Sequence, residues 1–356
     1  MKKIALIFGL IPFAAMAETD AEIALNGVID NVRNQCGGIS ANLESLKKMA
    51  GIGTAVNAVG TVAGAGGVVS GIVKYNKDSN IGFNMGQKYS IELIKEKLKE
   101  KTNSPENQRA LSNFQQAAPD FNWDEIDAGL DKLSKDYEKM SSDEQAKYMA
   151  QLDAKAAAAQ KAIDDNQKAS DTFGNIRTGL FATNTATSVA GAVISSKTNV
   201  DEDLAARIKA CSDSMVALQD ASARVRFEDG ANANTALLEK SQNILDKCSQ
   251  YKDVDTDSLN KLAHGATISG AVGGATGLAA TITSIMGTNN KVSDVDLKSE
   301  NAVDELNKHS NINVASNILG GVTAATSLTG TVLNATQIKK IKNVVTISEN
   351  CEEALQ

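Results

Sequence analysis

Residues 263–290 read AHGATISGAVGGATGLAATITSIMGTNN, a run that contains no Asp, Glu, Lys or Arg and is not interrupted by proline. Small residues dominate this run, so it favours a helix of many turns that a second helix can approach closely. Three further runs have the same character, at residues 49–73, 178–196 and 310–337. We therefore expect four small-residue helices to organise the fold.

The composition supports an all-α fold. Only 3 prolines and 4% aromatic residues accompany 27 glycines, which favours long helices over a loop-rich β protein. The net charge of −7 argues against a nucleic-acid partner. The chain contains two histidines, His264 and His309, which leaves little scope for His-based metal or catalytic sites. We expect both histidines at exposed helix ends.

The first residues resemble a secretory signal peptide. Lys2 and Lys3 precede an apolar run at residues 4–13, and Ala15-Met16-Ala17 forms a small-x-small cleavage site. The expected signal peptide is residues 1–17, cleaved after Ala17. We therefore expect a periplasmic or secreted protein, in an oxidising compartment where paired cysteines form disulfides.

An internal repeat suggests how the four cysteines pair. Residues 31–36 read NVRNQC and residues 243–248 read NILDKC, and later in each half ATSVAG at 186–191 matches ATSLTG at 325–330. The two halves are predicted to be residues 18–79 with 171–235, and residues 236–356. If each half is a helical hairpin, its cysteine-bearing arms meet at the open end. The expected disulfides are therefore Cys36–Cys211 and Cys248–Cys351.

The first half carries an insertion, residues 80–170, that is rich in Lys, Glu, Asp, Gln and Ala. Apolar residues in its second part recur at alternating steps of three and four, which predicts an antiparallel coiled-coil hairpin that turns at Ser141-Ser142-Asp143. The two predicted seams are Ile126, Leu130, Leu133, Tyr137 and Met140, and Met149, Leu152, Ala156, Ala159 and Ile163. The aromatic cluster Phe114, Phe121 and Trp123 is expected to fill a helix junction, with a binding hot spot as the alternative.

Within the small-residue runs, small side chains also recur every four residues. Examples are Ala63, Gly67 and Gly71, then Ser269, Gly273 and Gly277, and the ridge Gly179, Thr183, Thr187 and Gly191. These segments resemble glycine zippers, a motif class found in both membrane and soluble proteins. The residues expected to pack helix against helix are Gly67, Gly71, Gly191, Gly273, Gly277 and Gly330.

Whether these runs enter a membrane is the main alternative. Their lengths could span a hydrocarbon core. Against this, they are rich in Thr and Ser, and Asn311, Asn313, Asn317 and Asn334 lie in the fourth run. Lys47-Lys48 and the lysines at 339–342 would also lie on the outer side, against the positive-inside tendency. The sequence alone therefore favours soluble hairpins.

No motif in the sequence indicates catalysis, a metal or a cofactor. The acidic segment at 253–257 lacks the Gly and Glu of a calcium loop, and the glycines at 270–277 lack the Gly-Lys-Ser/Thr of a phosphate loop. A hydrolase would need a buried acid pair that no motif reveals. We expect an exported, non-enzymatic helical scaffold of the cell envelope that self-associates or binds a protein partner. The alternative is a membrane-inserting or pore-forming secreted protein.

Overall fold

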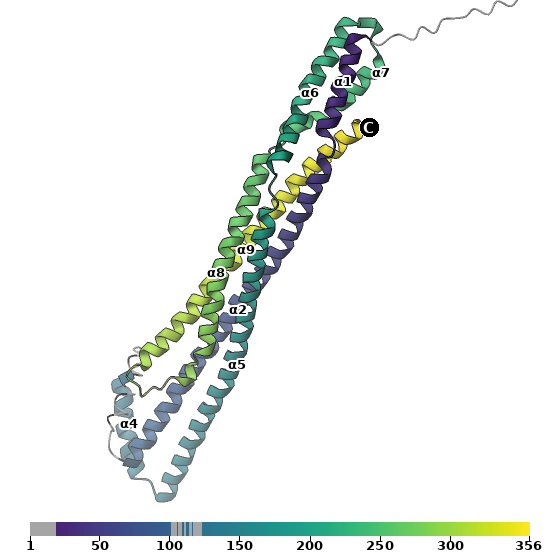
Figure 1. The fold of residues 1–356 in the computed structure, drawn as a ribbon. Coiled ribbons are helices and arrows are strands. Elements are labelled where there is room, and N and C mark those ends of the chain that lie inside the picture. Colours follow the sequence, from purple (N-terminus) through teal and green to yellow (C-terminus); the bar gives the residue numbers. More distant parts are fainter. Residues whose placement is uncertain (1–18, 101–104, 106–108, 110–111, 114–115, 117–122) are drawn as a thin grey trace, which may run out of the picture. The chain divides into compact units, whose positions relative to one another are not determined.

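The computed structural model describes residues 19–356, except for 101–104, 106–108, 110–111, 114–115 and 117–122 (Figure 1). The described chain is helical and contains no strand, as its composition predicted. The predicted signal peptide, Phe114 and Phe121 lie outside the described residues. The α-helices are α1 (Asp20–Cys36), α2 (Ile39–Glu100), α4 (Trp123–Glu138), α5 (Ser142–Ser196), α6 (Glu202–Glu228), α7 (Thr235–Cys248), α8 (Thr256–Asn289) and α9 (Ala302–Ala354).

The chain divides into two compact units. Unit 1 comprises Met1–Ala50, Lys197–Leu262 and Thr336–Gln356, and unit 2 comprises Gly51–Ser196 and Ala263–Ala335. The predicted boundaries at 79/80 and 170/171 fall inside α2 and α5, which continue across them. The division into two halves and an insertion therefore stays a prediction.

Unit 1 has an ordinary apolar core, in which α1 packs against α6. Leu25, Ile29, Leu218 and Ile244 are among its fully or almost fully buried side chains. Helix α1 begins with a capping box, in which the Thr19 side chain accepts a hydrogen bond from the Glu22 backbone and the Glu22 side chain accepts one from Thr19.

Between α1 and α2 the chain turns at Gly38, whose φ of 76° lies in the left-handed region that glycine adopts without strain. The turn keeps the cysteine at the end of α1 within unit 1. Asp255 caps the start of α8. The Asp255 carboxylate accepts a hydrogen bond from the Ser258 backbone at 2.9 Å.

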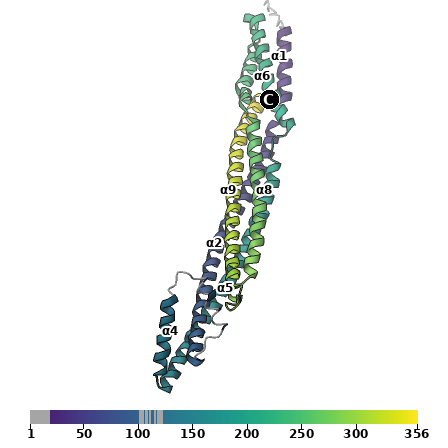
Figure 2. The same ribbon diagram turned by 90° about the vertical axis from the view of Figure 1, so that its left-hand side faces the viewer.

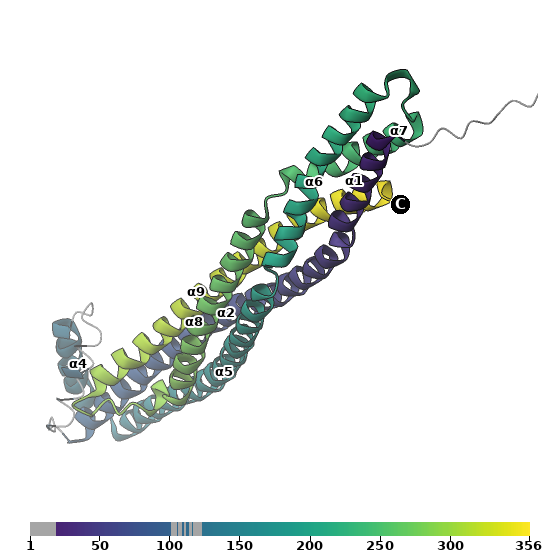
Figure 3. The same cartoon turned by 45° about the horizontal axis from the view of Figure 1, so that its top comes forward.

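In unit 2, α2, α5, α8 and α9 run side by side (Figures 1, 2 and 3). Buried positions recur along each helix at alternating steps of three and four, the spacing that keeps one side of a helix against its neighbours. In α9, for example, they are Asn313, Ser316, Gly320, Thr323, Ser327, Gly330 and Asn334. Long uninterrupted helices with one inward side therefore build this bundle.

The predicted coiled-coil hairpin lies in the part of unit 2 rich in charged residues. Helix α4 ends at Glu138 and α5 begins at Ser142, and the rings of Tyr137 and Tyr148 contact each other with centroids 6.0 Å apart. Ile163 packs with Ile81 of α2, so along this stretch α5 also contacts α2. The coiled coil itself stays a prediction, because the side chains of Ile126 and Leu130, like that of Trp123, are outside the described set.

Candidate functional site

The outward side of the unit 2 bundle is apolar. We call the exposed apolar residues of 52–75, 176–193, 268–286 and 314–332 the apolar belt. In these ranges every exposed position is Ala, Val, Ile, Leu, Met or Tyr, except Gly179, Thr183 and Thr329. Its large members are Ile52, Val59, Val62, Val69, Ile72, Tyr75, Ile176, Val189, Val193, Ile268, Val272, Leu278, Ile282, Ile285, Met286, Val314, Ile318, Val322, Leu328 and Val332.

The inward side of the same bundle is polar. We call eight of its buried Asn, Ser and Thr side chains the polar seam: Asn57, Asn184, Ser188, Ser195, Ser316, Thr323, Ser327 and Asn334. Hydrogen bonds across helices join several of them. The Ser327 hydroxyl donates to Asn184 Oδ1 at 2.9 Å, and Asn334 Nδ2 donates to Ser195 Oγ at 3.1 Å. The bundle therefore reverses the usual distribution of a soluble protein, in which large apolar side chains are buried.

Glycines bring these helices close together. A Cβ on Gly191 would lie 2.1 Å from Asn57 Oδ1, and one on Gly330 would lie 2.8 Å from Asn57 Nδ2. The other glycines predicted to pack helices are equally confined: a Cβ on Gly67, Gly71, Gly273 or Gly277 would lie within 2.8 Å of a side chain of another helix.

The ridge expected on α5 is wrong in part, because Gly179 and Thr183 are exposed. Phe181, Asn184 and Ser188 face inward instead, since burial follows alternating steps of three and four rather than uniform steps of four. The glycine zipper as a motif stays a prediction.

A charged cluster lies among the same helices. Lys74 Nζ donates to Asp78 Oδ2 at 2.6 Å and to Ser170 Oγ at 3.2 Å. Arg177 donates through Nε to Ser284 Oγ at 2.8 Å and through Nη1 to Asn313 Oδ1 at 3.0 Å. Lys74, Asp78 and Arg177 are buried, so two cationic side chains share a single buried carboxylate.

His309 completes the charged cluster, and the expectation that it lies at an exposed helix end is wrong: it is 5% exposed. Because Arg177 bonds Asn313 Oδ1, the Asn313 amide must direct Nδ2 toward Asp78 Oδ2 at 3.0 Å and His309 Nδ1 at 2.9 Å. Nδ1 therefore accepts a hydrogen bond, and Nε2 carries the proton of the neutral ring.

Several buried polar atoms of the seam and cluster have no hydrogen-bond partner among the described residues. They are both amide atoms of Asn57, Asn184 Nδ2, Asn317 Oδ1 and His309 Nε2. Asp78 Oδ2 lies 3.9 Å from His309 Nε2, too far for a hydrogen bond. Each unsatisfied buried group of this kind costs about 1–3 kcal/mol.

The sequence contained a signal for this cluster that the search for motifs missed. Lys74 and Asp78 continue the buried register of Gly67 and Gly71 at steps of three and four, and Arg177 has the same relation to Phe181. A charged residue in phase with a buried small-residue face is a candidate for burial.

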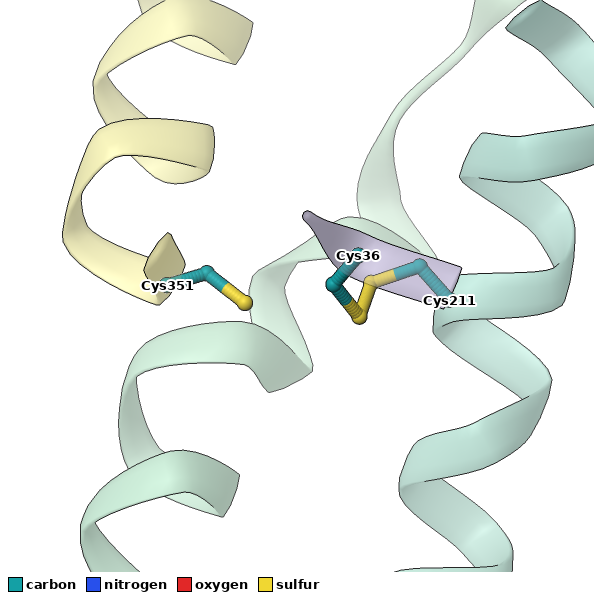
Figure 4. Close-up of side chains that lie close together, drawn as sticks. All are labelled: Cys36, Cys211 and Cys351. Carbon is teal, nitrogen blue, oxygen red and sulfur yellow. A yellow bond between two sulfur atoms is a disulfide. The ribbon is translucent and has the colours of Figure 1, made fainter. Parts of the chain in front are cut away.

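In unit 1 the four cysteines form the two disulfides that the repeat predicted. Cys36 is bonded to Cys211 and Cys248 to Cys351, and all four are fully buried. The sulfur atoms of Cys36, Cys211 and Cys351, from α1, α6 and α9, lie within 4.8 Å of one another (Figure 4). Because these sulfurs are bonded in disulfides, they offer no thiolate to a metal.

By length and hydropathy alone, two described helical segments could cross a membrane. They are Asp20–Lys99 and Thr256–Asn289, whose most apolar 18-residue windows have mean hydropathy 1.6 and 1.3. The mean hydropathy of a window averages the residues on the inward side of a helix with those on its outward side. Within residues 176–193 of α5 and 314–332 of α9, all Asn, Ser and Thr residues except Thr183 and Thr329 are buried or half-buried, so this mean does not describe their outward side.

No known protein family, curated protein or solved structure matches this chain. Its function must be argued from its own residues.

Proposed function

We propose that this is an exported, non-enzymatic protein whose unit 2 bundle inserts into a lipid bilayer, while unit 1 remains in water. The observation that carries the proposal is the pairing of an apolar belt outside with a polar seam inside. In lipid the helices gain nothing by burying large apolar side chains. Small residues and interhelical hydrogen bonds hold such bundles together.

The length of the apolar belt along the helices is close to the thickness of the hydrocarbon core of a membrane. From Ile268 to Met286, and from Val314 to Val332, each helix rises about 27 Å at 1.5 Å per residue. The hydrocarbon core of a bilayer is about 30 Å thick. No Asp or Glu lies within the four belt ranges, and their two basic side chains, Lys74 and Arg177, are buried.

The belt also favours lipid over a protein partner. A partner protein covers one side of a molecule, whereas α2, α5, α8 and α9 all present exposed Val, Ile or Leu side chains. An exposed apolar surface on every helix of a bundle is large for a soluble monomer. A surrounding apolar solvent covers all of it at once.

The asparagines that argued against a membrane lie where they are tolerated. Asn313 and Asn334 are fully buried inside the bundle, Asn317 is half-buried with its Oδ1 inside, and Asn311 is exposed but precedes the belt. Amide groups that face a bundle interior cost far less than amides that face lipid. This distribution supports insertion over soluble hairpins.

In this proposal the bundle consists of two hairpins, α2 with α5 and α8 with α9, one from each half of the repeat. Four spans return the chain to the side on which it starts, so both disulfides share one compartment, which must be oxidising. The lysines at 47–48 and 339–342 then lie on the outer side. The positive-inside tendency acts during synthesis, so insertion after export is consistent with them.

Flotation with liposomes tests the proposal, with a matched pair of variants. Val62 of the belt is 74% exposed and Val216 of unit 1 is 62% exposed. An aspartate in the middle of a membrane helix costs about 2.5–3.5 kcal/mol. Val62→Asp should therefore lower the partition coefficient between vesicles and water about a hundredfold. Val216→Asp should leave this partition coefficient unchanged.

Wild-type protein that stays at the bottom of the gradient, and forms oligomers through the belt instead, would establish the alternative. The protein would then be a self-associating soluble scaffold.

A further inference from the structure

We infer that the polar seam and the charged cluster form a proton pathway through the bundle, and that Phe181 closes it. The inference rests on the proposed insertion of unit 2 into a bilayer. It follows from three features of the interior: unpartnered polar atoms, a single aromatic barrier, and titratable groups beside that barrier.

The first feature is a series of hydrogen-bonding groups along the bundle. Following α9, Asn334 is bonded to Ser195, then Asn57 lies against Gly330, then Ser327 is bonded to Asn184 and Ser188. Both amide atoms of Asn57 and Nδ2 of Asn184 lack a partner among the described residues. Hydroxyl and amide groups in such a series can pass a proton along by exchanging hydrogen bonds.

The second feature is Phe181, which interrupts this series. It is fully buried and lies one turn from Asn184 on one side and from Arg177 on the other. Its ring fills the space between two glycines: a Cβ on Gly67 would lie 2.3 Å from Cε1, and one on Gly320 would lie 2.1 Å from Cζ. The ring has no polar atoms and lies between Asn184 of the seam and Arg177 of the charged cluster, where it acts as a hydrophobic constriction does in a channel.

The third feature is the charged cluster on the far side of Phe181. Its titratable groups are Lys74 and Asp78 from α2, Arg177 from α5 and His309 from α9, and α8 contributes the hydroxyl of Ser284. Among the described residues, His309 Nε2 has no partner at hydrogen-bond geometry, and Asp78 is the one buried carboxylate of the cluster. Buried ionisable groups inside a membrane bundle commonly mark ion or proton routes.

The close packing selects the proton over larger species. The glycines along the seam leave no room even for a methyl group, so a hydrated ion or a solute has no lumen to pass through. A proton needs none, because it can enter from water at one end, pass along the hydrogen-bonding groups of the seam and the charged cluster, and return to water at the other end. No other reactant is consumed.

Proteoliposomes that contain a pH-sensitive dye test the inference. A potassium gradient with valinomycin supplies the driving force, and three proteins are compared. Wild type and Phe181→Leu, which keeps the barrier apolar, should leak protons within about twofold of empty vesicles. Phe181→Asn, which continues the polar seam, should raise the proton flux at least tenfold. Adding His309→Gln to Phe181→Asn should lower that flux again, because the added glutamine holds no proton at neutral pH.

Each outcome has a separate meaning. Phe181→Asn that floats with vesicles but leaks no faster than Phe181→Leu would overturn the pathway and leave the proposed function intact. The same holds if Phe181→Asn admits potassium without valinomycin, since the route would then be an ordinary pore. Wild-type protein that does not float would overturn the proposed function, and the pathway with it. Non-reducing electrophoresis and circular dichroism establish that each variant is folded.

Discussion

Two adjacent glycines of α9 differ sharply in their surroundings, which makes them a matched pair. A Cβ on Gly320 would lie 2.1 Å from Phe181 Cζ, whereas one on Gly321 would meet nothing within 4 Å. Alanine in place of glycine inside a helix stabilises it by about 0.5–1 kcal/mol where there is room. Gly321→Ala should therefore stabilise the protein by that amount.

Gly320→Ala should have the opposite sign. The Phe181 ring has no room to move away toward α2, because its opposite neighbour is Gly67 of that helix. The two are packed so closely that a Cβ on Gly67 would lie 2.3 Å from Phe181 Cε1. Overpacking of this kind costs about 1–3 kcal/mol of stability. The stabilisation that alanine gives a helix in place of glycine offsets part of this cost. The expected net loss is about 0.5–2 kcal/mol, so the two alanine variants should differ by roughly 1–3 kcal/mol.

The assay is reversible unfolding in mild detergent with both disulfides intact, followed by circular dichroism. Phe181→Leu should remove most of the difference between the two alanine variants, because the shorter side chain leaves room for the methyl group. Gly320→Ala as stable as Gly321→Ala in the wild-type background would refute the packing of Phe181 between the two glycines.

Two further predictions concern a disulfide and a buried tyrosine of unit 1. Replacing Cys36 and Cys211 by alanine should cost up to about 5 kcal/mol, because the bond closes a loop with a sequence separation of 175; an unchanged melting temperature would contradict this. Burial raises the pKa of Tyr251 to about 12 from 10, so its contribution is complete below pH 10 and is lost between pH 10 and 12; Tyr251→Phe should be less sensitive in that range, and equal sensitivity would count against it.

The sequence was sufficient for the parts of the fold that follow from composition and repetition. Long runs without proline predicted helices, and the repeated landmarks around Cys36 and Cys248 predicted which cysteines are bonded. Both are properties of the chain that need no knowledge of which side of a helix faces inward.

The candidate site required that knowledge. Asn313 and Val314 are neighbours in sequence, but one is fully buried and the other is 43% exposed. The composition of a whole run does not distinguish Asn, Ser and Thr residues that face inward from those that would face lipid. The composition alone therefore argued against insertion into a membrane. The phase of the alternating three and four steps, rather than the composition, separates the polar seam from the apolar belt.

The charged cluster was missed for a related reason. Lys74 and Arg177 border the uncharged runs, where a charged residue normally marks the return to water. Their burial depends on partners far away in sequence, namely Ser284 and Asn313 for Arg177. The steps of three and four along each helix mark these residues as candidates for burial, but they do not say which distant side chains become their partners.

The most direct measurement of the central claim is fluorescence quenching by brominated lipids. In a Trp123→Phe background, one tryptophan replaces Val322 of the belt, and in a second protein one replaces Val216 of unit 1. Bound to vesicles with bromine at the middle of the acyl chains, Val322→Trp should be strongly quenched and should resist aqueous iodide, and Val216→Trp should show the reverse. Equal quenching of both tryptophans by iodide, with no effect of the brominated lipid, would contradict the insertion of unit 2.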